Sequence, residues 1–203
     1  MKLWTIQHEE AYHEFERTGV LRANNDYLFC EDDFRYAYDW IAQQMVEKVG
    51  APPDAEIKYP IWAWYKWEGK RKRRDLRCSG YGNRGTPMVQ IEFEASDNTV
   101  LLSDFDDWHL VMAYHYIPDS EEDYDRFYKE HEPESRLPWG MGQDNTDPRI
   151  QPMLADIRSS WWKVFDLGYN GWCSSKPGRE YIQATLWQIT RDQVRKVEHF
   201  KAK

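Results

Sequence analysis

The segment from residue 89 to residue 115 constrains the fold most, because it joins two apolar strands to one capped helix. Residues 89–94 alternate apolar and polar side chains, which is the pattern of a strand with one buried face. A polar turn separates them from a second apolar run at residues 100–102. Ser103 opens a Ser-x-x-Asp capping pattern, so we expect a helix from about residue 104 to residue 116.

Three carboxylates crowd the first turn of this expected helix. Asp104, Asp106 and Asp107 would face the positive end of the helix dipole, an interaction worth ~0.3–1 kcal/mol for each. Together with His109 they also allow a metal-site interpretation. We favour the dipole explanation, because neighbouring carboxylates point in different directions on a helix. The sequence therefore predicts no metal centre here.

Length and composition place the chain among ordinary globular domains. With 203 residues and 41% hydrophobic residues, it is long enough for one well-cored domain and too apolar for wholesale disorder. The count of 11 tryptophans is high, and such rings build either cores or stacking surfaces for bases and cofactors. A net charge of −8 argues against general coating of nucleic acid, although a local basic groove is still compatible with it.

Cysteine usage and hydropathy favour a cytoplasmic protein without a membrane partner. Cys30, Cys78 and Cys173 are far apart and odd in number, as expected for reduced thiols. The first residues carry charges where a signal peptide needs an apolar core. No apolar run approaches the ~20 residues that a membrane-spanning helix needs.

The remaining pattern predicts a single α+β domain over residues 1–203. Helices are expected at residues 8–18, 33–49 and 155–167, and strands at residues 2–7, 59–67, 181–189 and 197–200. The strand at 59–67 is apolar on both faces, so it lies in the middle of a sheet or forms the wall of a cleft. The acidic segment at residues 119–152 is rich in loop residues and is interpreted as an insertion.

The segment KWEGKRKRRDLR, residues 66–77, concentrates positive charge in an otherwise acidic chain. One interpretation is a nucleic-acid site formed by Lys70, Arg71, Arg73 and Arg74. The other is a solvated loop whose charges keep an edge strand from aggregating. The sequence leaves both interpretations open.

Common catalytic and phosphate-binding motifs are absent. The chain contains no GxSxG, HExxH, GxGxxG or GxxxxGK[ST] pattern. Neither His8 with His13 nor His109 with His115 has a spacing that shares one helix face. A functional hypothesis must therefore come from resemblance.

Five stretches resemble a bacterial domain family of unknown function. They are LWTIQ near the start, AYDW, YPIWAW, LLSDFDDWH and the final IQATLWQITRDQVRKVEHFKAK. The resemblance covers essentially the whole chain. It brings no activity with it.

The order of elements also resembles that of the DNA-targeting ADP-ribosyltransferase toxins. Those proteins begin with a strand, a helix and a Gly-Leu pair, to which residues 3–21 are similar. Their Pro-aromatic strand and arginine-bearing loop correspond to residues 59–77, and their strand-Asp-helix segment corresponds to residues 100–109. Their Asp-Trp helix is similar to residues 160–166, and their last catalytic strand is similar to residues 181–187.

This second resemblance implies an ADP-ribosyltransferase-like fold, a split antiparallel or mixed sheet with flanking helices, and NAD as the ligand. The residues that it places around NAD are Gln7, His8, Trp64, Tyr65 and Arg77. Gln183 or Ala184 stands where the toxins carry their catalytic glutamate, and Gln183 would face the scissile bond. Glutamine can bond the ribose but lacks the charge that stabilises an oxocarbenium ion, so the resemblance implies weakened or lost transfer chemistry.

Two other hypotheses stay open beside the NAD-binding one. A nucleic-acid-binding module would use the basic loop on phosphates and exposed tryptophan rings on bases. A protein-interaction or regulatory domain would use the acidic surface, the aromatic patches and the insertion at residues 119–152.

Overall fold

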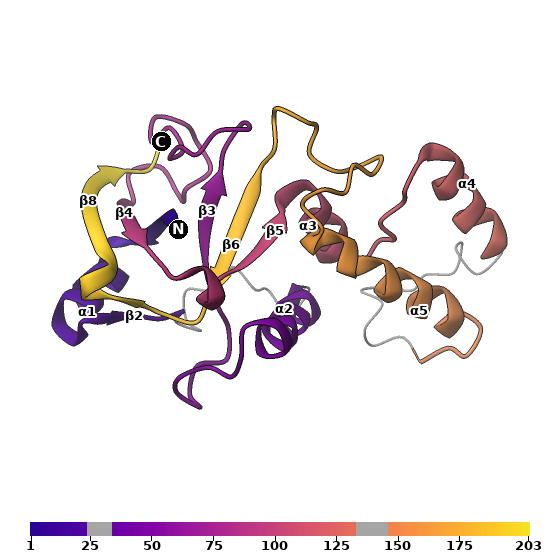
Figure 1. The fold of residues 1–203 in the computed structure, drawn as a ribbon, viewed down its shortest axis with the longest axis horizontal. Helices are drawn as coiled ribbons and strands as arrows, with labels where there is room; N and C mark the ends of the chain where they lie inside the picture. Colours follow the sequence, from indigo (N-terminus) through magenta and orange to yellow (C-terminus); the bar gives the residue numbers. More distant parts are fainter. Residues whose placement is uncertain (24–33, 133–145) are drawn as a thin grey trace.

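A six-stranded sheet forms the centre of the computed structural model, which describes residues 1–23, 34–132 and 146–203 (Figure 1). The strand order is β5-β6-β3-β1-β4-β8, and every neighbouring pair is antiparallel. The strands are β1 (Lys2–His8), β3 (Ile61–Lys66), β4 (Pro87–Glu94), β5 (Leu101–Asp104), β6 (Ile182–Leu186) and β8 (Val194–Lys201). Strands β2 (Val20–Leu21) and β7 (Ile189–Thr190) pair separately. The predicted α+β class is confirmed.

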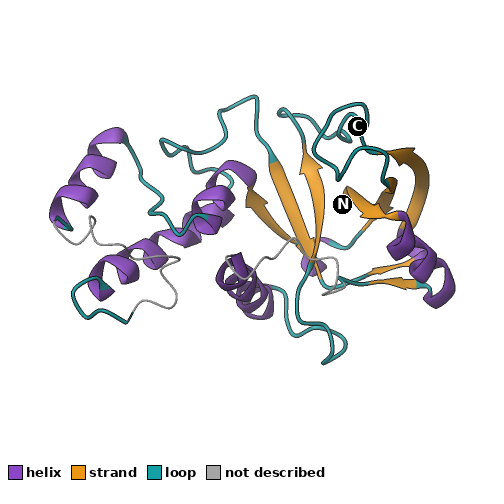
Figure 2. Ribbon diagram, turned by 180° about the vertical axis from the view of Figure 1, so that it is seen from behind, coloured by secondary structure: helices purple, strands orange, loops and turns teal. Residues whose placement is uncertain are grey.

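Helices flank the sheet and extend away from it at one end. They are α1 (Glu9–Thr18), α2 (Arg35–Lys48), α3 (Phe105–Met112), α4 (Glu121–Glu130) and α5 (Gln151–Ser160). Figure 2 shows α4 and α5 at the end of the molecule opposite to α1 and β8. Among the described residues, no helix has the length and apolar character needed to cross a bilayer.

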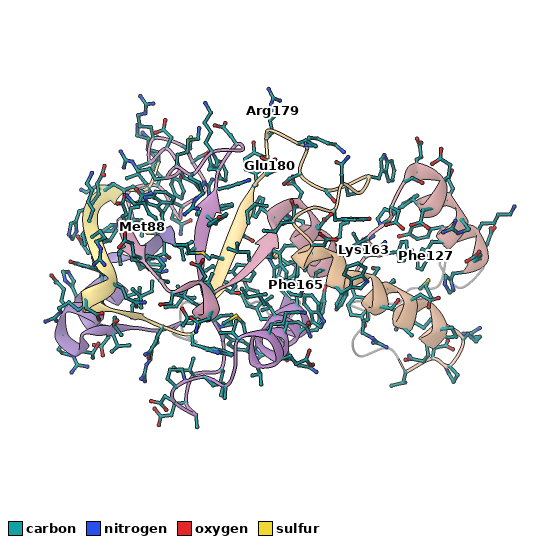
Figure 3. The ribbon with its side chains drawn as sticks, viewed as in Figure 1. Met88, Phe127, Lys163, Phe165, Arg179 and Glu180 are labelled. Carbon is teal, nitrogen blue, oxygen red and sulfur yellow. The ribbon has the colours of Figure 1, made fainter. Side chains whose placement is uncertain are left out.

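The two faces of the sheet are covered differently. On one face, Phe15 of α1 packs with apolar residues of β3, β4 and β6. On the other face, α2, α3 and α5 cover the β5-β6-β3 half in one large cluster that includes Leu101. The β1-β4-β8 half of that face is covered by the loop after β3, where Tyr81 packs on Met88 (Figure 3). The boundary between these two coverings runs along the junction of β3 and β1.

Local capping explains most helix boundaries, with one correction. Gly19 adopts a left-handed conformation (φ 77°) and its N–H bonds the carbonyl of Phe15, as expected for the end of α1. The cap of α3 is Asp104 and not Ser103, because the Asp104 carboxylate accepts the N–H groups of residues 106 and 107. Ser103 instead lies inside β5, and Asp104 is both the last residue of that strand and the helix cap. The helix stops at Met112, earlier than predicted, because Tyr114 has a positive φ of 54°.

Other predicted boundaries shift by a few residues. Helix α2 begins at Arg35, and its predicted cap at residues 32–33 lies outside the described part of the chain. Helix α5 begins at Gln151, earlier than predicted, because Pro152 is well suited to a first helical turn. Within residues 119–152, α4 is capped by Ser120 and buries Phe127 in the large helical cluster. Residues 133–145 of this expected insertion lie outside the described residues.

Candidate functional site

The sheet is split between β1 and β3. Strand β1 pairs with β4 along its whole length, but it shares only the Trp4–Trp64 pair with β3. Beyond that pair, the Thr5 hydroxyl donates to the Trp62 carbonyl at 2.7 Å, so a side chain replaces a backbone bond of the ladder. The two strands then diverge and leave room between them.

A pocket of about 270 Å³ occupies this split. Its walls come from segments that are far apart in the sequence, namely β1, β3, β6, α2 and the loop after β3. The lining includes Ile6, Gln7 and His8 from β1, Trp62 and Trp64 from β3, Gln183 from β6, Tyr38 from α2, and Arg74 and Tyr81 from the loop. None of the described residues that line it is Asp or Glu. The described lining of this pocket thus contrasts with the acidic composition of the chain.

Gln183 lines the pocket from β6. It pairs in register with Trp64 of β3 on one side and with Ser103 of β5 on the other, so the three side chains share one face of the sheet. Gln183 is only 9% exposed, yet its Oε1 has no hydrogen-bond partner among the described residues. The Ser103 hydroxyl is buried and unpartnered in the same way. A buried polar group without a hydrogen-bond partner lowers stability by ~1–3 kcal/mol. Such groups therefore indicate where a bound ligand can supply the missing hydrogen bond.

Trp62 forms an aromatic wall of the pocket. Its ring centroid lies 4.8 Å from that of Trp108 in α3 and 6.2 Å from that of Tyr38 in α2. The indole Nε1 of Trp62 is buried without a partner among the described residues. The wall therefore offers both a flat stacking surface and one unused donor.

Arg74 lies at the edge of the pocket between three aromatic rings. Its guanidinium is 4.3 Å from the ring centre of Trp67, 4.6 Å from that of Tyr81 and 5.3 Å from that of Trp64. A tight turn positions Arg74. Residues 67 and 70 pair as an isolated antiparallel β-bridge, and the two residues between them, Glu68 and Gly69, both have positive φ. This turn sends the chain back over the face that carries Trp64.

The structure brings four of the predicted ligand residues together. Gln7, His8, Trp64 and Gln183 all line the pocket, although they come from three strands. The Gln7 amide donates to the Thr5 hydroxyl at 2.7 Å, so it also supports the site where the ladder opens.

Tyr65 and Arg77 are not among the residues that line the pocket. Strand alternation turns Tyr65 away from Trp64, and Arg71 covers the Tyr65 ring at 3.8 Å. The Arg77 guanidinium is held at 2.6 Å by Asp75, and this contact keeps the pKa of the Asp75 carboxyl well below its usual range. Both side chains therefore contact other residues of the protein outside the pocket.

The basic loop is partly neutralised by the chain itself. Lys72 pairs with Glu68, and Arg73 pairs with Glu198 at 2.7 Å. Among the described residues, Lys70, Arg71 and Arg74 have no ion pair, and Arg71 donates to the carbonyl of Lys2. Fewer cations are thus available to a nucleic-acid backbone than the sequence alone indicates.

Three aromatic residues in the described lining, Trp62, Tyr38 and Tyr81, were not predicted as ligand contacts. Trp62 had a signal, because it shares a strand face with Trp64 at two-residue spacing. Tyr38 and Tyr81 had none, because they reach the pocket from α2 and from an irregular loop. Only the tertiary arrangement places them there.

The carboxylates at the start of α3 serve a structural purpose. The Ser174 hydroxyl donates to Asp107 at 2.8 Å, and the Ser175 hydroxyl donates to Asp106 at 2.8 Å. Burial raises the pKa of the Asp107 carboxyl to about 6. In the described ranges, no three His, Cys, Asp or Glu residues are grouped so that they could hold a metal ion.

Comparison with known proteins identifies the family. The chain belongs to the domain of unknown function DUF3841, whose family model matches residues 2–195. No curated protein and no solved structure matches the chain. The prediction that almost the entire chain is a family domain of unknown function is confirmed, and the function of this DUF3841 domain has to be argued from the pocket.

Proposed function

We propose that this DUF3841 domain is an ADP-ribosyltransferase-like domain that binds NAD or a related nucleotide in the split between β1 and β3. One observation carries the proposal. Gln7 and His8 of β1, Trp64 of β3 and Gln183 of β6 line a single pocket where the sheet opens. These are four of the residues that the toxin resemblance assigns to NAD.

The chemistry of the lining fits a nucleotide. Trp62 and Trp64 offer flat faces to a planar ring, and the amides of Gln7 and Gln183 offer hydrogen bonds to sugar hydroxyls or to a carboxamide. The volume of about 270 Å³ is close to the lower end of the ~300–1,000 Å³ typical of small-molecule sites. The pocket suits one ring and its sugar, with the rest of a dinucleotide extending towards solvent.

Gln183 determines whether binding leads to chemistry. When bound, NAD would supply the glycosidic bond that ADP-ribosyl transfer breaks. The Gln183 amide can orient a ribose hydroxyl, but it is neutral and cannot stabilise positive charge developing on the sugar. We therefore expect binding with little or no transfer, which is the behaviour of a sensor or a degenerate enzyme.

The test is a pair of substitutions at Gln183, measured by calorimetric titration with NAD and by an NAD-cleavage assay. Gln183→Ala is expected to weaken NAD binding about tenfold, because it removes one buried hydrogen-bonding group. Gln183→Glu is expected to raise NAD cleavage above the wild-type level, because it introduces the missing charge.

Gln188→Ala is the matched control, since Gln188 follows the same strand but does not line the pocket. It should leave both readouts unchanged. The proposal fails if neither substitution at Gln183 changes NAD binding or NAD cleavage. The nucleic-acid-binding and partner-binding hypotheses would then be favoured.

A further inference from the structure

Arg74 lines the pocket and has no ion pair among the described residues. Lys72, Arg73 and Arg77 each have a carboxylate of the chain within ion-pair distance. Arg74 has none among the described residues, and its buried Nε lacks a hydrogen-bond partner there. A guanidinium taken partly out of water without a counter-charge is costly, so its position requires an explanation.

The surroundings of Arg74 are fixed by contacts from both sides. The Gly69 N–H donates to the Glu180 carbonyl at 2.9 Å, which ties the turn to the loop before β6 (Figure 3). A side chain at Gly69 would meet the Gly178 carbonyl oxygen at 2.3 Å, so the two segments are in direct contact. Tyr81 donates its hydroxyl to the Asp75 carbonyl at 2.8 Å. The guanidinium is therefore held in place before any ligand arrives.

The three rings around Arg74 restrict how it can be used. Trp64, Trp67 and Tyr81 approach the guanidinium within 4.3–5.3 Å and hold it through cation–π contacts. The N–H groups not covered by these rings are left for an acceptor. A phosphate accepts two parallel N–H bonds from a guanidinium, which a neutral acceptor cannot match in strength.

The charges of the pocket lining also favour an anionic ligand. No Asp or Glu is among the described lining residues, and the other lining arginine, Arg22, is already paired with Asp54 at 2.8 Å. Of the two arginines in the described lining, Arg74 is thus the one without an ion pair and can meet an incoming anion. Gln183 and Trp62 belong to the same pocket, so the anion would be joined to a group that carries a ring or a sugar.

We propose that Arg74, held between Trp64, Trp67 and Tyr81, is a phosphate-binding subsite of this pocket. The subsite rests on the proposed function, because it takes the phosphate of the same nucleotide. It makes Arg74 a residue that selects phosphorylated nucleotides over nucleosides. It also separates Arg74 from the other arginines of the basic loop, which bind the chain's own carboxylates and carbonyls.

The experiment compares ADP with adenosine by calorimetric titration, since the two share base and ribose and differ in their phosphates. NAD is titrated in parallel. Wild type is expected to bind ADP at least about tenfold more tightly than adenosine, and Arg74→Gln is expected to remove that difference. Arg74→Lys should keep only part of it, because an ammonium retains the charge but loses the paired N–H geometry.

Arg77→Gln is the control, since Arg77 lies outside the pocket and is paired with Asp75. It should leave the preference for ADP unchanged. Thermal denaturation checks that each variant folds. If Arg74→Gln does not fold, Arg74→Lys and competition of inorganic pyrophosphate against ADP in wild type decide the question in its place.

The outcomes separate the subsite from the proposed function. NAD binding without any preference for ADP over adenosine would overturn the subsite and leave the proposed function standing. A preference for ADP that depends on Arg74, without NAD binding, would support the subsite and contradict the NAD proposal. If ADP, adenosine and NAD all fail to bind, both are overturned.

Discussion

Two tryptophans of this domain belong to the same aromatic cluster but differ in their hydrogen bonds. Trp161, next to α5, is 1% exposed, and its indole N–H donates to the His115 carbonyl at 3.0 Å. Trp62, in β3, packs against Trp108, and its indole N–H has no partner among the described residues. Trp161 is buried and Trp62 is partly buried, but the Nε1 atom is enclosed in both, and only that of Trp161 has a partner among the described residues.

The same contrast extends to the charged and amide groups around each tryptophan. Near Trp161, the buried Lys163 donates to the Ile117 carbonyl and pairs with Asp119, both at 2.8 Å (Figure 3). Near Trp62, Gln183 and Arg74 each keep a buried polar atom without a partner. Among the described residues, the polar groups of Trp161 and Lys163 are therefore paired, whereas those of Trp62, Gln183 and Arg74 around the sheet split are not fully paired.

This difference teaches how to distinguish a core from a site in a protein with many aromatic residues. Buried polar groups in folded proteins almost always find partners, so a group of unpartnered atoms around one pocket is informative. Asp107 is an intermediate case, because one of its oxygens accepts from Ser174 and the other is buried without a partner among the described residues, as are the side-chain oxygens of Ser103 and Gln188. None of these three residues is among those that line the pocket.

The largest expected effect on stability is at Trp161. Trp161→Phe removes the donor to the His115 carbonyl and part of a fully buried ring, so it should lower the free energy of unfolding by about 2–4 kcal/mol. Chemical denaturation followed by circular dichroism measures this. NAD binding by the folded variant should be unchanged. A loss below about 0.5 kcal/mol would mean that the hydrogen bonds of the helical region contribute little.

An intermediate effect is expected at Asp107, and it should depend on pH. Burial raises the pKa of this carboxyl from 3.8 to about 6, so the folded state disfavours the ionised form. The resulting penalty is absent below about pH 4, grows between pH 4 and 6 and is complete above pH 6. Asp107→Asn should therefore stabilise the protein by on the order of 2 kcal/mol at pH 7.5 and hardly at all near pH 4.

Denaturation curves of wild type and Asp107→Asn at pH 4, 5, 6 and 7.5 measure this dependence. Asp106→Asn is the matched control, since Asp106 is in the same turn but only half-buried. Its stability difference from wild type should not follow the same pH profile. An Asp107→Asn variant that is destabilised equally at every pH would show that its carboxylate is needed to hold Ser174.

The smallest effect on stability is expected at Trp62, where the effect on binding should be larger. Trp62→Phe keeps an aromatic ring and removes an N–H that bonds none of the described residues, so the loss of unfolding free energy should stay below about 1 kcal/mol. If the free N–H serves a ligand, nucleotide affinity should fall about tenfold. Comparison with Trp161→Phe by denaturation and titration tests the contrast. Equal losses of unfolding free energy in the two variants would contradict the contrast between the two tryptophans.

Local patterns predicted the scaffold well. The end of α1 at Gly19 and the strand β4 follow from residues close together in the chain, so sequence rules were sufficient. The cap of α3 was assigned one residue early, because Ser103 and Asp104 are both good caps and only the sheet determines which one ends the strand. Such choices depend on tertiary contacts that a local pattern does not contain.

The pocket was only partly predictable. Gln7, Trp64 and Gln183 were expected together through resemblance, and strand pairing explains why they meet. Alternation along β3 already turns Tyr65 to the other face. The distinct environment of Arg74 could not be predicted from the sequence. It depends on the turn after Trp67 and on which of the other arginines form ion pairs with carboxylates of the chain.

The most direct test of the central claim is calorimetric titration of the wild-type protein with NAD and with ADP-ribose, at low and moderate salt. The account predicts saturable binding of at least one ligand in the micromolar range, with an affinity that weakens only modestly as salt rises. No heat and no shift in thermal denaturation with either ligand would contradict the claim that the unpartnered groups in the sheet split form a nucleotide site.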